Sequence, residues 1–212
     1  GDVLIAQPSA NCFVLTPSTG DFAFSCEFLP TYTTTFTDYL LPTFGEAATA
    51  SATAWAKFWN EGGVVDFSAC TDPRAPELER RVVLSQYLMA IQAAGDTPPQ
   101  ETGLTYNSWY GKFHLEMIWW HQSHFPLWGH ADKLHHTLSW YEKARPMARS
   151  IAERQGYKGV RWMKMTDPSA AEAPSKVGSF LIWQQPHLIY LAELVYRANP
   201  TKEVLDKYFK LV

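Results

Sequence analysis

Residues 98–130 read PPQETGLTYNSWYGKFHLEMIWWHQSHFPLWGH, and this stretch dominates the chemistry of the 212-residue chain. It contains four of the nine tryptophans and four of the seven histidines. Glu116 is the one acid within its aromatic and apolar second half. A helix that only fills a core does not need this mixture. A pocket that stacks flat polar rings and hydrogen-bonds their hydroxyl groups does need it, so we expect a ligand pocket here.

Helical patterns extend from this stretch towards the C-terminus. The capping-box pair Thr43 and Glu46 marks the first helix start, and Gly156 marks a helix end before a loop at 156–180. Pro146 is expected to kink or divide the helix that contains it. The helices are predicted at 44–60, 74–94, 110–124, 130–155, 181–198 and 201–210.

Two of these helices carry stripes that we assign to faces. Leu78, Val82, Ser85 and Met89 form one stripe of the second helix. The third helix separates into a face with His114 and another face with Glu116, which places Glu116 in the middle of a helix.

The N-terminal part has a different texture. Short apolar or alternating runs at 1–30 predict two or three strands, and a threonine-rich segment at 31–43 predicts a linker to a helical domain at 44–212. Cys12 and Cys26 lie on neighbouring strand-like runs, so either a disulfide or two buried free thiols is expected.

Composition excludes several classes of function. The net charge is −3 and the basic residues form no block, which argues against nucleic-acid binding. No apolar run reaches the length of about 20 residues that a membrane span needs. Cysteine usage leaves the compartment open, with a secreted or extracytoplasmic location favoured. His121 and His124 are three residues apart rather than four, so we predict no metal and no cofactor.

Paired helices with functional loops at one end are typical of an α/α toroid. Six helices make three hairpins, so we predict a mainly α fold, about half of an (α/α)6 toroid, preceded by strands from a β-sandwich-like domain.

The motifs in this order resemble glycoside hydrolase family 65 and its six-hairpin relatives. ETGLTYNSWYGKFHLEM is similar to the family's Gly-Leu-Thr … Tyr-x-Gly-His-x-Phe-Trp-Asp-Thr-Glu, and GYKGVRWMKMTDPSAAEAP to its Gly-Tyr-x-Gly-Ala-x-Phe-Pro-Trp … Glu-x-Pro. WQQPHLIYLAELVYR resembles the helix that follows, so the likeness covers about 75–200.

The resemblance implies a site as well as a fold. Gly111 matches the motif glycine, Lys112 replaces a histidine, Leu115 replaces the tryptophan and Glu116 replaces the aspartate that grips the sugar. The family's general acid comes from a loop after the third hairpin, which would lie beyond Val212. We therefore expect the remainder of the polypeptide, together with a carbohydrate, as partners.

A glycoside hydrolase needs two carboxyl groups, and the residues offer several. Glu101, the remaining acid of the opening stretch, is assigned either to the pocket or to capping the third helix. The catalytic candidates are Glu116 and Glu172. The substrate-binding candidates are Trp109, Tyr110, Lys112, His114, Trp119, Trp120, His121, Trp162, Lys164, Asp167, Gln185 and His187. His135 and His136 are expected to face solvent.

Three alternatives stay open. The first is a carbohydrate-binding protein or fragment without catalysis. The second is a polysaccharide lyase with Tyr110 as base and Arg161 as neutralising group. The third is a glycoside phosphorylase, although no residue pattern specifically marks a phosphate site.

Overall fold

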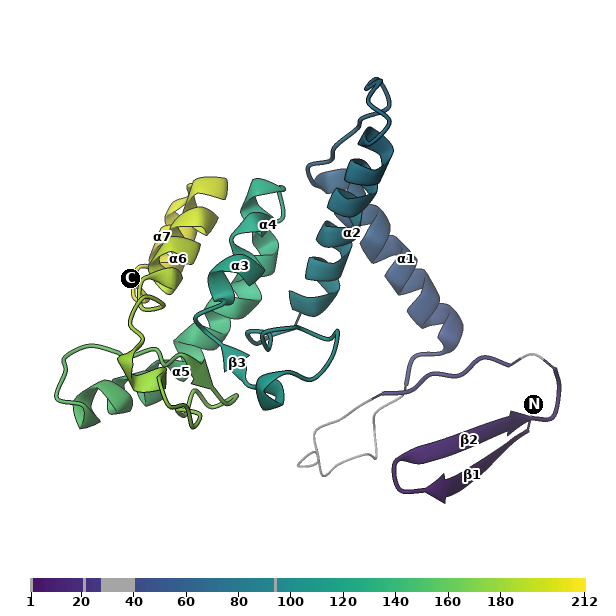
Figure 1. Ribbon diagram of the computed structural model, residues 1–212, viewed down its shortest axis with the longest axis horizontal. Helices are drawn as coiled ribbons and strands as arrows, with labels where there is room; N and C mark the ends of the chain where they lie inside the picture. The colour runs from purple at the N-terminus through teal and green to yellow at the C-terminus, as the bar shows by residue number, and fades with distance from the viewer. Residues whose placement is uncertain (1, 21, 28–40, 94) are drawn as a thin grey trace. The chain divides into compact units, whose positions relative to one another are not determined.

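The computed structural model describes residues 2–20, 22–27, 41–93 and 95–212 (Figure 1). Its contacts divide the chain into two compact units, Gly1–Asn60 and Glu61–Val212. Most of the predicted linker at 31–43 lies outside the described residues, so the boundaries at 30 and 43 stay predictions.

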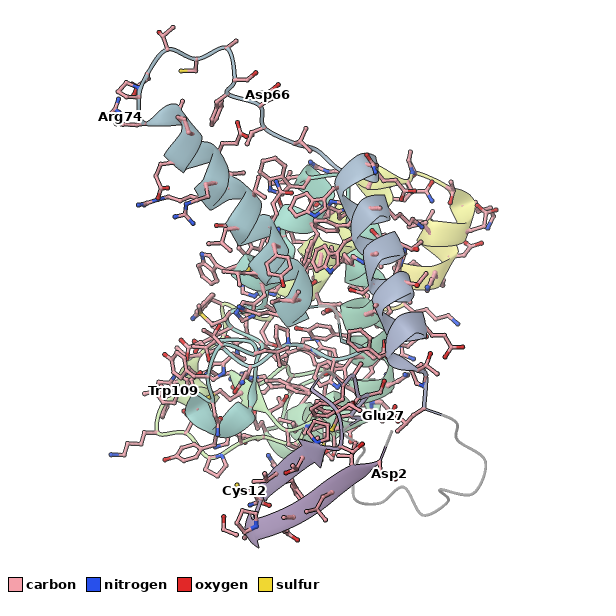
Figure 2. The ribbon with its side chains drawn as sticks, turned by 90° about the vertical axis from the view of Figure 1, so that its right-hand side faces the viewer. Asp2, Cys12, Glu27, Asp66, Arg74 and Trp109 are labelled. Atoms are coloured by element: carbon pink, nitrogen blue, oxygen red, sulfur yellow. The ribbon has the colours of Figure 1, made fainter. Side chains whose placement is uncertain are left out.

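The first unit begins with a β-hairpin. Strands β1 (Val3–Ser9) and β2 (Cys12–Pro17) pair antiparallel, and Asn11 takes a left-handed φ of 63° in the turn, which asparagine tolerates well. The predicted third strand is wrong, since residues 22–27 form no strand. Cys12, which Figure 2 labels on the β-hairpin, and Cys26 are free and exposed, so they form neither the disulfide nor the buried thiols that we expected.

Helix α1 (Phe44–Glu61) confirms the capping box. The Thr43 backbone N–H donates to Glu46 Oε2 at 2.8 Å, and the Glu46 N–H donates to Thr43 Oγ1 at 3.2 Å. Trp55 and Trp59 stack one turn apart with ring centroids 6.3 Å apart. Local capping chemistry therefore defines where this helix starts.

Helix α2 (Ala75–Ala93) opens the second unit. The face predicted from Leu78 and Met89 is not its buried side, because Leu78 is exposed and the buried residues are Gln86 and three alanines. Small alanine side chains allow the close approach of α3 (Ile118–Gln122), which α2 contacts.

The predicted helix at 110–124 is wrong in its first half. The chain forms a 3-10 turn at Trp109–Gly111, a short strand β3 (Phe113–His114) and a turn, and only then α3 and α4 (His124–Leu127). Glu116 therefore lies in a turn between β3 and α3, and the two faces assigned to a single helix do not exist before Ile118.

Three helices form the core of the second unit. Helix α5 (Leu134–Arg154) contacts α6 (His187–Ala198), which contacts α7 (Lys202–Tyr208). Pro146 does not divide α5. Gly156 takes φ 78° and donates its N–H to Glu153, which ends α5 as predicted. The completely or almost completely buried side chains here include Leu138, Tyr141 and Leu191.

The helix predicted at 181–198 begins six residues later, at His187. The preceding loop contains a short strand β4 (Met165–Thr166) and a 3-10 turn (Gly178–Phe180). In the part of the chain that the structure describes, the fold is mainly α with a few strands in two small sheets, and its arrangement as half of a toroid stays a prediction. Among the described residues, no helix combines the length and hydrophobicity that a membrane crossing requires.

Candidate functional site

A narrow backbone ladder brings three distant segments together in the second unit. Phe113 pairs with Thr166 between β3 and β4, an isolated bridge joins Gln100 to Phe113, and another joins Thr166 to Glu172. The residues next to these bridges are therefore neighbours although the sequence separates them widely. Glu101 follows the first bridge, Glu116 follows β3 and Lys164 precedes β4.

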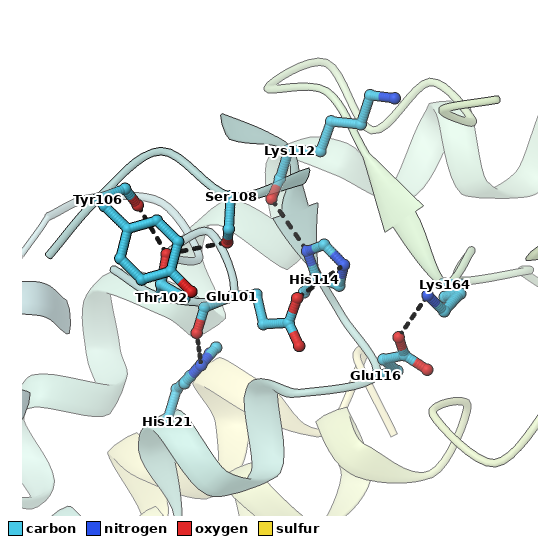
Figure 3. Close-up of polar contacts among 9 residues, drawn as sticks. All are labelled: Glu101, Thr102, Tyr106, Ser108, Lys112, His114, Glu116, His121 and Lys164. Atoms are coloured by element: carbon cyan, nitrogen blue, oxygen red, sulfur yellow. Dashed lines mark hydrogen bonds and ion pairs between the residues drawn. The ribbon is translucent and has the colours of Figure 1, made fainter. Parts of the chain in front are cut away.

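Glu116 and Lys164 form an ion pair at this ladder (Figure 3). The Lys164 Nζ lies 2.7 Å from Glu116 Oε1, and the two side chains are only 12% and 13% exposed. The Leu115 N–H donates to the Lys164 carbonyl at 2.9 Å, which fixes the spacing of the two backbones. The sequence singled out both residues, and Lys112, another candidate from the sequence, lies over the Tyr110 ring.

Trp109 covers this ion pair. The Lys164 Nζ lies 5.3 Å from the centroid of the Trp109 ring, within the range of a cation–π contact. The same ring lies 5.9 Å from the His114 ring, yet Trp109 remains 53% exposed. One part of the indole surface therefore lies near the Lys164 ammonium group and the His114 ring, and another part faces solvent.

Trp109 is the first of three consecutive residues with left-handed backbone. The φ angles are 49° at Trp109, 62° at Tyr110 and 69° at Gly111. A residue with a Cβ atom loses about 1–2 kcal/mol in this conformation, and such strain concentrates at functional sites. The preceding loop is braced by the Thr102 hydroxyl, which lies 2.7 Å from the Tyr106 carbonyl and 2.9 Å from the Ser108 hydroxyl.

His114 and His121 add two further polar side chains to the site. His114 Nδ1 lies 3.3 Å from the Lys112 carbonyl, and its Nε2 lies 3.9 Å from Glu101 Oε2. His121 Nε2 donates to the Glu101 carbonyl at 3.0 Å. Burial lowers the pKa of both histidines, so both rings are uncharged at neutral pH.

Glu101 was not among the catalytic or substrate-binding candidates predicted from the sequence. No helix begins beside it, so it does not cap a helix as one interpretation had it; its carboxyl group faces His114. The backbone bridge between Gln100 and Phe113 brings the neighbouring Glu101 to His114. A single bridge of this kind leaves no periodic signal in the sequence.

A second aromatic group lies at the start of α6. Trp119 stacks on Tyr190 with ring centroids 4.1 Å apart, and His187 Nδ1 donates to the Leu115 carbonyl at 3.2 Å. Trp120 is exposed and meets the edge of Trp183. Of these residues, Trp120 and Trp183 are exposed to solvent, whereas His187 is buried.

Trp162 and Gln185 occupy structural positions. Trp162 is 4% exposed and packs against Tyr141, which leaves no ring face for a ligand. Gln185 accepts from the Trp162 N–H at 2.9 Å, and Gln184 donates to the Trp162 carbonyl at 3.0 Å. The pocket wall predicted from these side chains is therefore a backbone clamp.

The loop acids are also engaged elsewhere. Asp167 accepts hydrogen bonds from the Ser169 and Ala171 N–H groups, which closes its own turn. Glu172 lies 3.4 Å from Arg154 and accepts from Ser179 at 3.1 Å. These contacts shape the loop at 156–180 and hold both carboxylates in local pairs.

The remaining histidines of α5 differ from expectation. His135 is half-buried, stacks on Tyr208 and hydrogen-bonds its hydroxyl, so the expected solvent-facing position is wrong for it. His136 is exposed and contacts Asp96 at 2.6 Å. Across the described ranges, no three His, Cys, Asp or Glu side chains are arranged to hold a metal ion.

Comparison with known proteins adds no relative. No family model, no curated protein and no solved structure matches the chain. The resemblance to six-hairpin glycosidases therefore stays a prediction, and the chemistry of the site rests on its own geometry.

Proposed function

We propose that the chain is a carbohydrate-active protein of the glycoside hydrolase type, and that Trp109, Glu116 and Lys164 form its sugar-binding wall. The observation that carries the proposal is the largely buried ion pair of Glu116 and Lys164 beneath a half-exposed tryptophan ring.

The physical chemistry of a sugar matches this arrangement. A pyranose has an apolar C–H face, which packs on an indole ring, and a rim of hydroxyl groups that donate and accept. The Glu116 carboxylate accepts hydrogen bonds from hydroxyl groups, whereas the Lys164 ammonium donates to them. Hydrogen bonds to charged groups are about twice as strong as neutral ones, which suits a small, well-hydrated ligand.

The left-handed turn supports the same function. Trp109 and Tyr110 sit on strained backbone, so the folded chain holds the two rings in place before any ligand arrives. Tyr110 is 86% exposed, and such exposure of a large aromatic side chain beside a charged pair is typical of a binding surface.

A second candidate function is sugar binding without bond cleavage. It is favoured by one observation, namely that Lys164 holds the Glu116 carboxylate at 2.7 Å. A carboxylate in such a pair orients hydroxyl groups well without itself donating a proton. The lyase alternative lacks comparable support, because Arg161 donates to the carbonyls of Ser179 and Leu181.

The test titrates the 212-residue protein with maltose, cellobiose and methyl glucosides, using calorimetry and tryptophan fluorescence. Trp109→Ala and Glu116→Gln are expected to weaken binding about tenfold or more, which corresponds to about 1.4 kcal/mol. The matched controls are Tyr157→Ala, another exposed aromatic residue, and Glu193→Gln, whose carboxylate pairs with Arg197 on the surface of α6. Both controls should bind like the wild type.

Release of reducing sugar from the same disaccharides separates the two candidates. Binding with cleavage supports a hydrolase, and binding without cleavage selects the binding protein. If no saccharide binds, or if the control variants lose as much affinity as Trp109→Ala, the sugar-binding wall is refuted.

A further inference from the structure

Glu101 lies on a turn that the backbone holds on two sides. The bridge between Gln100 and Phe113 fixes the turn to β3, and the Gly103 N–H closes it by donating to the Gln100 carbonyl at 3.1 Å. His121 Nε2 also donates to the Glu101 carbonyl. The position of this carboxylic acid is therefore determined by backbone contacts, as is typical of a residue that must meet a ligand accurately.

One oxygen of the Glu101 carboxyl group is buried, although the side chain as a whole reaches the surface. Oε2 is buried and receives no hydrogen bond, while the side chain as a whole is 31% exposed. The atom that faces Oε2 is His114 Nε2, which also lacks a partner, on a side chain that is 1% exposed. Two buried polar atoms thus face each other across 3.9 Å without a hydrogen bond.

The tautomer of His114 explains this gap. The Lys112 carbonyl can only accept, so Nδ1 must carry the proton that it donates there. Nε2 of an uncharged ring is then a bare acceptor, and it faces a carboxylate oxygen that is also an acceptor. The pair lacks one proton, and a proton taken up by either partner would supply the missing hydrogen bond.

The charges around His114 come from every segment that packs on it. Glu101 and Glu116 raise its pKa, Lys164 lowers it, and burial lowers it most. His121 lies close enough that the two rings influence each other. The ring is therefore uncharged at neutral pH, and its bare Nε2 faces the Glu101 carboxyl group.

We propose that Glu101 is the second carboxyl group of the sugar site and its proton donor, and that His114 is the positioning residue that orients it. The proposal rests on the proposed function. It assigns a donor within this chain, where the family resemblance places the general acid beyond Val212.

The proton transfer balances within one cycle. Glu101 gives its proton to the glycosidic oxygen as the bond from that oxygen to the anomeric carbon breaks, and the bonding electron pair stays with the oxygen. Water then adds to the anomeric carbon and releases its surplus proton to the solvent, from which the Glu101 carboxylate is reprotonated for the next cycle. The Glu116 carboxylate stabilises the positive charge that develops on the sugar ring.

Substrates with different leaving groups test the donor directly. Glu101→Gln is expected to lower kcat on maltose or cellobiose about 100-fold or more, because general acid catalysis contributes about that much. The same variant should retain near-wild-type kcat on dinitrophenyl glucosides, whose leaving group departs without a proton. Equal losses on both substrates would overturn the donor role while leaving the proposed function intact, and so would unchanged activity on the disaccharides.

Nitrogen-edited NMR of the His114 ring tests the pair without any sugar. The wild type should show the Nδ1–H tautomer, and Glu101→Gln should move the His114 titration midpoint because it changes the group that faces Nε2. Glu193→Gln serves as the control and should leave the midpoint unchanged. An unmoved midpoint in Glu101→Gln overturns the pairing, and a protein that binds sugars but cleaves none overturns the donor while the binding wall stands.

Discussion

The ion pair between Glu116 and Lys164 should be strongly coupled, and a double-mutant cycle can measure this. The two charged groups lie 2.7 Å apart, so their gross attraction is about 6 kcal/mol at an effective dielectric constant of about 20. Desolvation of two nearly buried ions offsets most of this attraction. We therefore expect a net coupling free energy of about 2 kcal/mol.

The single variants should be more harmful than the double variant. Glu116→Gln leaves the Lys164 ammonium without its counter-ion, and Lys164→Met leaves the Glu116 carboxylate alone, each at a cost of about 3 kcal/mol in the free energy of unfolding. The double variant Glu116→Gln with Lys164→Met removes both charges, so it should recover much of that loss.

Urea unfolding followed by tryptophan fluorescence is the assay, because seven of the nine tryptophans lie in the unit at 61–212. The matched control is the pair Lys202 and Asp206 on α7, whose side chains are 78% and 56% exposed. Its coupling should be below about 0.5 kcal/mol. Coupling at Glu116 and Lys164 no larger than in the control would refute the reasoning from burial and distance.

The other predictions concern the pH dependence of stability, the left-handed backbone at Gly111 and the glutamine side chains that hold the backbone of Trp162. Burial lowers the pKa of His114 and His187, so the unfolded chain takes up protons first below about pH 6.5. Stability should be full above that pH and fall in the window below it, as urea midpoints would show. Unchanged midpoints over that window would contradict this. Gly111→Ala should lose about 1 kcal/mol from its left-handed φ, although the added Cβ has room; a thermal melt as stable as the wild type would argue against strain. Gln184→Ala should lose about 2 kcal/mol with its two hydrogen bonds to backbone carbonyls. Gln185→Ala should increase hydrogen exchange of the Trp162 N–H, which donates to Gln185, and an unaltered exchange rate would contradict the clamp.

Local chemistry was predictable from the sequence. The capping box of Thr43 and Glu46 and the helix end at Gly156 are both confirmed, since each depends on residues within one turn of the chain. The mainly α character follows from the same short-range signals.

The region around Glu116 was predicted poorly for the opposite reason. Apolar residues with helical spacing continue upstream of Ile118, but backbone pairing of Phe113 with Thr166 overrides that local pattern. Strands of two residues have no visible alternation. The sequence identified Glu116 and Lys164 as candidates, yet nothing in it shows that residues about fifty positions apart form one pair.

The ladder that joins Gln100, Phe113, Thr166 and Glu172 has a consequence for how the protein folds. The connection from Phe113 to Thr166 closes a loop of about fifty residues that includes α5, so loop-closure entropy must be overcome before the two backbones pair. Helices such as α5 form from local contacts, whereas we expect the backbone ladder to form only after these helices have packed together. We therefore expect the proposed sugar-binding wall to form late in folding. A saccharide bound there is expected to slow unfolding of the strands first.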